Sequence, residues 1–152
     1  MKTTARYGKK ADLALSMWVK LNRASATFGK KALEHIQSTG LTQAQFGALE
    51  CLGHLGKMTM CELSRKMLVT SGNTTVVIDN LEKQGLVERI PSRQDRRAIM
   101  ISLTSKGKKL FEEIFPRHAE YVAGLASVLT SREQETLGEL LKKLGRGIQE
   151  SE

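Results

Sequence analysis

Apolar residues recur every three or four positions at both ends of the chain, a spacing that predicts long amphipathic helices there. Pro116 lies inside the first C-terminal stripe and should bend that helix, and Thr130 with Glu133 forms a capping box before the second. The N-terminal stripe, which ends near Gly40, is Leu13, Met17, Leu21, Ala24, Phe28, Ala32 and Ile36. The C-terminal stripes are Leu110, Ile114, Tyr121, Val122, Leu125 and Leu129, then Leu137, Leu140, Leu141, Leu144 and Ile148. A small lobe cannot cover so much apolar surface, so we expect these helices to form a homodimer.

Three shorter helices are predicted between the terminal ones. Thr42 with Gln45 and Thr59 with Glu62 are capping boxes, and each precedes a short helical pattern. The first of these helices should stop at residues 53–56, and residues 57–58 leave room for only a token extended segment. A third helix should open at Thr70. Three short helices in this order form the tri-helical core of a helix-turn-helix.

The third helix has one apolar face and one small polar face. Thr74, Val77, Ile78 and Leu81 fall on one side and should pack inward. Amide and hydroxyl side chains can bond base edges, a valine can contact a thymine methyl, and the helix N-terminus can hold a phosphate. We therefore predict a DNA-reading face made by Thr70, Ser71, Gly72, Asn73, Thr75, Val76 and Asn80. For Thr70, a capping role alone is the alternative.

Two strands and a basic tip should follow. Gly85 fits the end of the helix, and residues 86–90 and 98–103 read as strands. In the second strand Ile99, Ile101 and Leu103 alternate with Met100 and Ser102, as in a half-buried strand. The tip, residues 91–97, carries Arg93, Asp95, Arg96 and Arg97 and no apolar side chain, which favours insertion along phosphates over a merely solvated loop. The Asp95 carboxylate can hold the guanidinium of Arg97 extended.

Charge and composition support a polyanionic partner. The formal net charge is +8, and residues 1–40 and 57–110 are basic whereas residues 111–152 are acidic. Two cysteines are too few for a disulfide framework, and no apolar run approaches a membrane span. We therefore expect a cytoplasmic protein with no membrane contact. No nucleophile–base pair, glycine-rich phosphate loop or plausible carboxylate pair is present, so we expect no enzymatic activity and no cofactor.

The chain resembles the MarR family of transcription regulators over nearly its whole length. The resemblance rests on the order and spacing of three motifs: Leu81-Glu82-Lys83-Gln84-Gly85-Leu86-Val87-Glu88-Arg89, then Asp95-Arg96-Arg97, then Leu103-Thr104-Ser105-Lys106-Gly107. It implies an obligate dimer with interlocked terminal helices and two winged lobes on a pseudo-palindromic operator. In the family pattern the helix from Thr70 reads the major groove, and Arg97 enters the minor groove.

The resemblance also raises the question of an effector. Members of this family often respond to small phenolic or aromatic acids, bound between the dimerisation helices and the winged lobe. By position, Met17, Trp18, Leu21 and His54 are candidates for such a site, with an ordinary core role as the alternative. Oxidant-sensing members carry a cysteine near the start of the first long helix, and residues 11–19 have none. Cys51 should be inert core, and Cys61, in the first turn of a predicted helix, is a candidate for a redox sensor.

A metal site is not expected, because His35, His54 and His118 are isolated in the sequence, with no ligand at metal-binding spacing. Taken together, the sequence predicts a mainly α (α+β) winged helix-turn-helix with six helices and a small β-hairpin wing. It should form one domain over residues 1–152, with dimerisation helices at about 11–40 and 105–150 and a DNA-binding lobe at about 42–104. The predicted function is a sequence-specific regulator, most simply a repressor, that a small aromatic or phenolic ligand releases from double-stranded DNA. The alternatives are a non-specific structural DNA-binding protein and a cysteine-based redox-sensing regulator.

Overall fold

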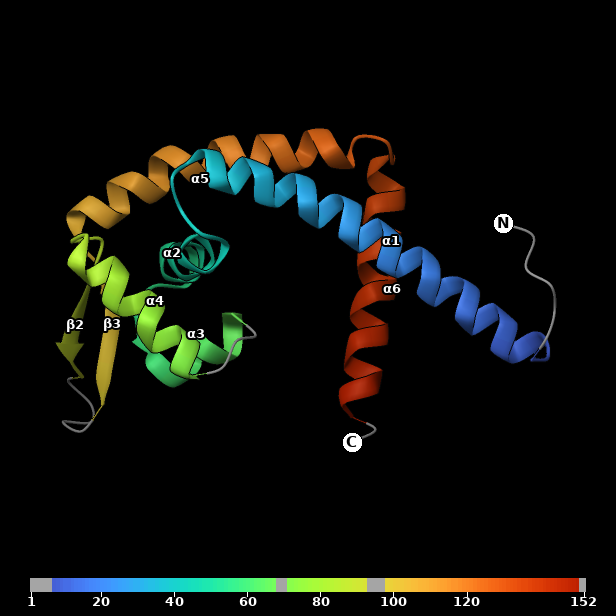
Figure 1. Ribbon diagram of the computed structural model, residues 1–152, viewed down its shortest axis with the longest axis horizontal. Helices are drawn as coiled ribbons and strands as arrows, with labels where there is room; N and C mark the ends of the chain where they lie inside the picture. Colours follow the sequence, from blue (N-terminus) through green and yellow to red (C-terminus); the bar gives the residue numbers. More distant parts are fainter. Residues whose placement is uncertain (1–6, 68–70, 93–97, 151–152) are drawn as a thin grey trace. The chain divides into compact units, whose positions relative to one another are not determined.

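The computed structural model describes residues 7–67, 71–92 and 98–150, which form six helices and a three-stranded antiparallel sheet (Figure 1). The helices are α1 (Lys9–Ser38), α2 (Gln43–Leu55), α3 (Met60–Met67), α4 (Ser71–Lys83), α5 (Ser105–Ala126) and α6 (Ser131–Gln149). The strands are β1 (Met58–Thr59), β2 (Val87–Pro91) and β3 (Ile99–Leu103). The predicted order of elements is therefore confirmed, with element ends within a few residues of those expected.

Local capping signals set several of these boundaries. The capping box at Thr42 is formed, since Gln45 N–H donates to the Thr42 hydroxyl and Thr42 N–H donates to the Gln45 side chain. Thr130 opens α6 with the same reciprocal pattern. Ahead of α3, Thr59 N–H donates to the Glu62 carboxylate at 2.8 Å, and this bond is the largest cause that lowers the pKa of Glu62. The three predicted capping boxes are thus present.

The described chain divides into two compact units, Met1–His118 and Ala119–Glu152. In the first unit, α2, α3 and α4 pack on one another and on the sheet, and the end of α1 packs on α2. The core of this unit is one apolar cluster, whose fully buried side chains include Leu49, Leu63, Ile78, Leu81 and Ile101. This cluster fixes α4 against the two preceding helices, as the apolar pattern predicted.

The sheet has the order β1–β3–β2. The short extended segment expected at residues 57–58 is strand β1, which pairs Met58 with Ile101 and Thr59 with Met100. The predicted alternation in β3 is only partly right: Ile101 is fully buried, but Ile99 is 55% exposed. Ile99 pairs with Pro91 at the end of the hairpin next to the tip.

The second unit contains the end of α5 and the whole of α6. No residue of α6 is buried, and Leu137, Leu140, Leu141 and Ile148 are exposed. Pro116 lies inside α5, within the first unit. Among the residues that the structure describes, no helix is long and apolar enough to cross a membrane.

Candidate nucleic-acid interface

Helix α4 separates the predicted inward and outward residues. Thr74, Ile78 and Leu81 are fully buried, and Val77 is half-buried. The opposite face exposes small and polar residues together with one apolar side chain, Val76, which is 61% exposed: these residues are Gly72, Asn73, Thr75, Val76 and Asn80. Thr70 lies outside the described residues, as does the side chain of Ser71. The structure thus supports the predicted reading face in its geometry, and its DNA contacts stay a prediction.

A buried hydroxyl pair joins α4 to α3. The Thr74 and Ser64 hydroxyl oxygens are 2.9 Å apart, and the Ser64 oxygen is also 2.9 Å from the Met60 carbonyl oxygen. The single hydroxyl proton of Ser64 has two acceptors within reach, the Met60 carbonyl oxygen and the Thr74 hydroxyl oxygen. Burying these polar atoms is tolerable only because they are paired, and the pairing fixes the rotation of α4 about its axis.

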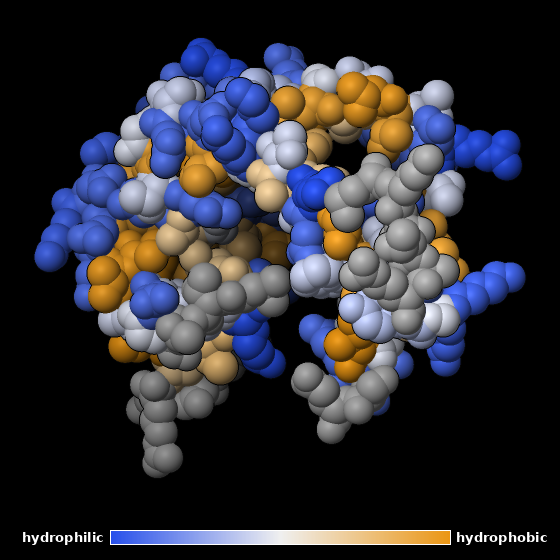
Figure 2. Space-filling view, turned by 45° about the vertical axis from the view of Figure 1, so that its right-hand side comes forward, coloured by the Kyte–Doolittle hydropathy of each residue, from blue (hydrophilic) through white to orange (hydrophobic). Residues whose placement is uncertain are grey.

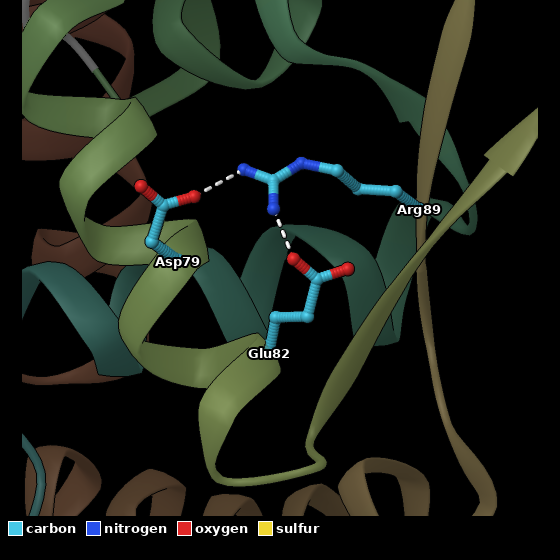
Figure 3. A network of polar contacts seen from close by, with 3 residues as sticks. All are labelled: Asp79, Glu82 and Arg89. Atoms are coloured by element: carbon cyan, nitrogen blue, oxygen red, sulfur yellow. Dashed lines mark hydrogen bonds and ion pairs between the residues drawn. The ribbon is translucent and has the colours of Figure 1, made fainter.

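An ion-pair network ties the flank of α4 to strand β2 (Figure 3). Arg89 Nη2 lies 2.6 Å from Asp79 Oδ1, and Arg89 Nη1 bonds Glu82 Oε2. Asp79 and Glu82 are three residues apart on one helix, so one planar guanidinium reaches both carboxylates. The hydrogen bond that Arg89 donates to Asp79 is the largest cause that raises the pKa of Arg89. Although Arg89 is basic and belongs to the wing, we infer that it positions the wing against α4, since both of its terminal nitrogens are occupied by protein carboxylates.

Next to the tip, the two strands of the wing are joined by a backbone hydrogen bond from Ser92 N–H to the Ala98 carbonyl at 2.9 Å. The tip residues predicted to reach the DNA, Arg93, Asp95, Arg96 and Arg97, lie outside the described residues. The expected contact between Asp95 and Arg97 is therefore also outside them. The described strands still carry the two ends of the tip side by side, because Pro91 and Ile99 are paired.

The candidate effector residues lie in two separate places. Met17 and Trp18 are 47% and 59% exposed on α1, and Leu21 is half-buried on the same helix. His54 is on α2, where its ring packs edge-on against Phe111 and Phe115 of α5, with centroids 5.1 and 4.3 Å away. The described residues do not bring His54 together with the three α1 residues, and their role in ligand binding stays a prediction.

The structure instead shows an open hollow of about 590 Å³ beside the end of α1, α2 and α3. Its lining combines apolar side chains with an acid, a base and an imidazole; the residues that matter here are Ile36, Phe46, Glu50, Lys66, Met67 and His118. Cys51 also lines it, and burial, followed by the nearby Glu50 charge, raises the pKa of the Cys51 thiol. Cys51 is half-buried and packs against the core, so the expectation of a core position is only partly right, and its inertness stays a prediction. Cys61 is exposed in the first turn of α3.

Two histidines that are isolated in the sequence meet in the structure. His35 at the end of α1 and His118 on α5 have their Nδ1 atoms 3.2 Å apart, within hydrogen-bonding distance. No sequence spacing predicts this contact, because the fold joins positions 83 residues apart in the chain. Burial, and then the proximity of His35, lowers the pKa of His118. No cluster of three potential metal ligands occurs in the described part of the chain.

The shifted pKa of His118 predicts that acid destabilises the fold. At higher pH this histidine is neutral in both the folded and the unfolded chain, so its lowered folded-state pKa does not affect the free energy of unfolding there. Stability is lost as the pH falls through about 6.5, the unfolded value, towards the lower folded pKa, because only the unfolded chain then takes up the proton. Urea denaturation at several pH values between about 7 and 5.5 should show this loss as a falling free energy of unfolding. In His118→Gln the free energy of unfolding should depend less on pH over the same range. If the free energy of unfolding of His118→Gln fell with pH as steeply as that of the wild type, the loss could not be assigned to His118. His54→Gln is the control.

Comparison with known proteins adds to this geometry. The model of the MarR family matches residues 41–99. MhqR of Bacillus subtilis (strain 168), an HTH-type transcriptional regulator, is 36% identical over 134 residues, which cover 88% of this chain and 92% of that protein. A MarR family protein from Bacillus stearothermophilus has a TM-score of 0.74 at 25% identity, with 93% and 99% of the two chains covered. A mutant MarR from E. coli in complex with operator DNA has a TM-score of 0.76 at 25% identity, with 90% and 99% covered. The predicted winged-helix fold is confirmed by these structures.

Proposed function

The chain belongs to the MarR family of transcription regulators, and from this premise we propose that it is a sequence-specific repressor that binds a pseudo-palindromic operator as a homodimer. It is a regulator of transcription and not an enzyme. The observation that carries the proposal is the division of α4, with Thr74, Ile78 and Leu81 fully buried and small polar residues exposed on the other side. Such a face can approach base edges closely. Its site of action would be the cytoplasm, where bacterial DNA lies.

The homodimer is supported by apolar side chains that each unit leaves uncovered. Figure 2 shows orange, apolar patches on the surface in view. On α1, Leu13 is 73% exposed and Trp18 is 59% exposed, and on α6 Leu140 and Ile148 are similarly exposed. A monomer would present these side chains to water at a cost, whereas a second copy can cover them. A two-fold dimer would place its two reading helices about 34–36 Å apart, in successive major grooves.

Direct reading by Asn73 gives a test of sequence specificity. We expect Asn73→Ala to cost roughly 1–3 kcal/mol of binding free energy on the operator, mainly at the base that the amide contacts, because an amide bonds adenine at two atoms.

Arg97→Ala should weaken binding to all DNA sequences and reduce the salt dependence of the affinity, as loss of a phosphate or groove contact does. Fluorescence anisotropy on operator, single-base variants and random DNA, at several salt concentrations, measures both effects.

The same titration separates the proposal from a non-specific DNA-coating protein. A coating protein would bind the upstream promoter fragment and random DNA with similar affinity, and Asn73→Ala would then lower both equally. That outcome would reject direct reading by α4.

We further propose that a small aromatic or phenolic acid relieves repression. The hollow beside α2 supports this, because Phe46 and Met67 offer apolar contact and Lys66 offers a cation for a carboxylate. The experiment is to titrate the protein–operator complex with a panel of aromatic acids and phenols, in the wild type and in Lys66→Met. If no compound releases the DNA, the effector proposal fails and the DNA-binding proposal is unaffected.

A further inference from the structure

The C-terminal end of α4 is closed by a Schellman motif. Gly85 has a φ of 70°, its N–H donates to the Glu82 carbonyl, and Leu86 N–H donates to the Leu81 carbonyl. Leu81 and Leu86 are both buried in the core, which is the apolar contact that accompanies this motif. The motif satisfies the carbonyls of Leu81 and Glu82, and the carbonyls of residues 84–86, which follow the helix, have other partners.

The segment that begins α5 supplies those partners. The Thr104 hydroxyl donates to the Gly85 carbonyl at 2.6 Å, and Thr104 N–H donates to the Leu86 carbonyl at 3.1 Å. The Lys106 ammonium donates to the Gln84 carbonyl at 2.7 Å. A cation at this position also interacts favourably with the negative C-terminal end of the α4 dipole. Three consecutive carbonyls at the end of α4 are thus bound by residues 104–106.

A close backbone contact completes this arrangement, which we call the α4–α5 socket (residues 84–86 with residues 104–107). A Cβ atom built on Gly107 would lie 1.9 Å from the Leu86 carbonyl oxygen, so only glycine fits. Gly107 N–H also donates to the Thr104 hydroxyl oxygen at 3.0 Å, which orients that hydroxyl toward Gly85. The first turn of α5 is therefore held directly against the backbone that ends α4.

We propose that the α4–α5 socket positions the reading helix relative to α5 and thereby sets the half-site spacing that the dimer accepts. The proposal rests on the homodimeric operator binding proposed above. Helix α5 runs from Ser105 to Ala126 with Pro116 inside it, so the socket joins the end of the reading helix to the first turns of a long helix. Thr104 and Lys106 are then positioning residues, because their donors bind protein carbonyls. Loosening them should let α4 adopt a wider range of angles on DNA.

The test uses Thr104→Val, Lys106→Met and the double variant, which remove the hydroxyl and the ammonium but keep most of the side-chain volume. The matched control is Lys109→Met, which removes the same charge from an exposed position of α5 outside the socket. The probe is a duplex selected by the wild type from a randomised library, together with copies in which one base pair is inserted or deleted between the half-sites. Affinity is measured on all three duplexes, and circular dichroism confirms folding.

The wild type and Lys109→Met should bind the altered spacings at least about tenfold more weakly, since the two reading helices must match successive grooves. In the socket variants we expect this ratio to fall to about threefold or less, even where overall affinity also drops. An unchanged spacing ratio in a folded Lys106→Met or double variant would overturn the proposal, because a merely structural role lowers affinity without changing the ratio. A wild type with no selected sequence or no spacing preference would instead reject the proposed function itself.

Discussion

Leu140→Asp should abolish operator binding by separating the subunits, with a loss of about a thousandfold or more in affinity, down to the level of non-specific binding. Leu140 is 59% exposed on α6, in the middle of a stripe of exposed leucines. In the proposed homodimer a partner covers this stripe. Each subunit would then bury an unpaired carboxylate, which costs several kcal/mol. A single lobe would keep only half of the contacts to bases and phosphates.

Light scattering coupled to size exclusion should show the mass halving in Leu140→Asp, and anisotropy should show the loss of operator binding. Lys142→Gln is the matched control, because it makes the same change in net charge on the opposite face of α6. The control should stay dimeric and bind the operator normally. A Leu140→Asp protein that remains a dimer, or a monomer that binds the operator as tightly as the wild type, would contradict the proposed use of this surface.

Gly107→Ala should destabilise the folded protein by about 3 kcal/mol or more, because the added methyl group would meet backbone and not a side chain that can move. The Cβ position lies 1.9 Å from the Leu86 carbonyl oxygen and 2.9 Å from its carbon. Relief requires the start of α5 to move away from the end of α4. Such a loss corresponds to a fall in melting temperature of about 6–12 °C for a chain of this size. Thermal denaturation followed by circular dichroism measures it.

Gly47→Ala is the control for this substitution. Gly47 lies inside α2, and a Cβ there would meet nothing within 4 Å. Because alanine loses less backbone entropy than glycine in a helix, this change should be neutral or stabilise by about 0.5–1 kcal/mol. Equal melting temperatures for the two variants would show that the contact at Gly107 does not limit stability.

The sequence predicts those features of this protein that depend on near neighbours in the chain. Capping boxes such as Thr42 with Gln45 join residues three apart, and Gly85 marks the end of its own helix, so both are visible as local patterns. The two faces of α4 follow from the helical period alone, and the burial of Thr74 and Ile78 agrees with it. The winged-helix order of elements could be predicted for the same reason.

Contacts between distant segments could not be predicted from such patterns. The pairing of His35 with His118 spans 83 residues, and no spacing rule connects them. Gly107 carries no sequence signal of its close approach to Leu86, because a helical glycine with an ordinary conformation is indistinguishable from one in open space. In the sequence, Arg89 looks like a residue that contacts DNA, because it is a basic residue in the wing. Only the fold shows that its guanidinium is paired with Asp79 and Glu82.

Strand β1 has a mechanical consequence for the way this lobe meets DNA. A two-stranded hairpin attached only at its ends can swing, whereas here β3 is also paired with Met58 and Thr59, directly before α3. Deflecting the hairpin would pull on the residues where α3 begins. We therefore expect the wing and the three short helices to respond to a duplex as one stiff body, so that misfit is taken up by bending of the DNA.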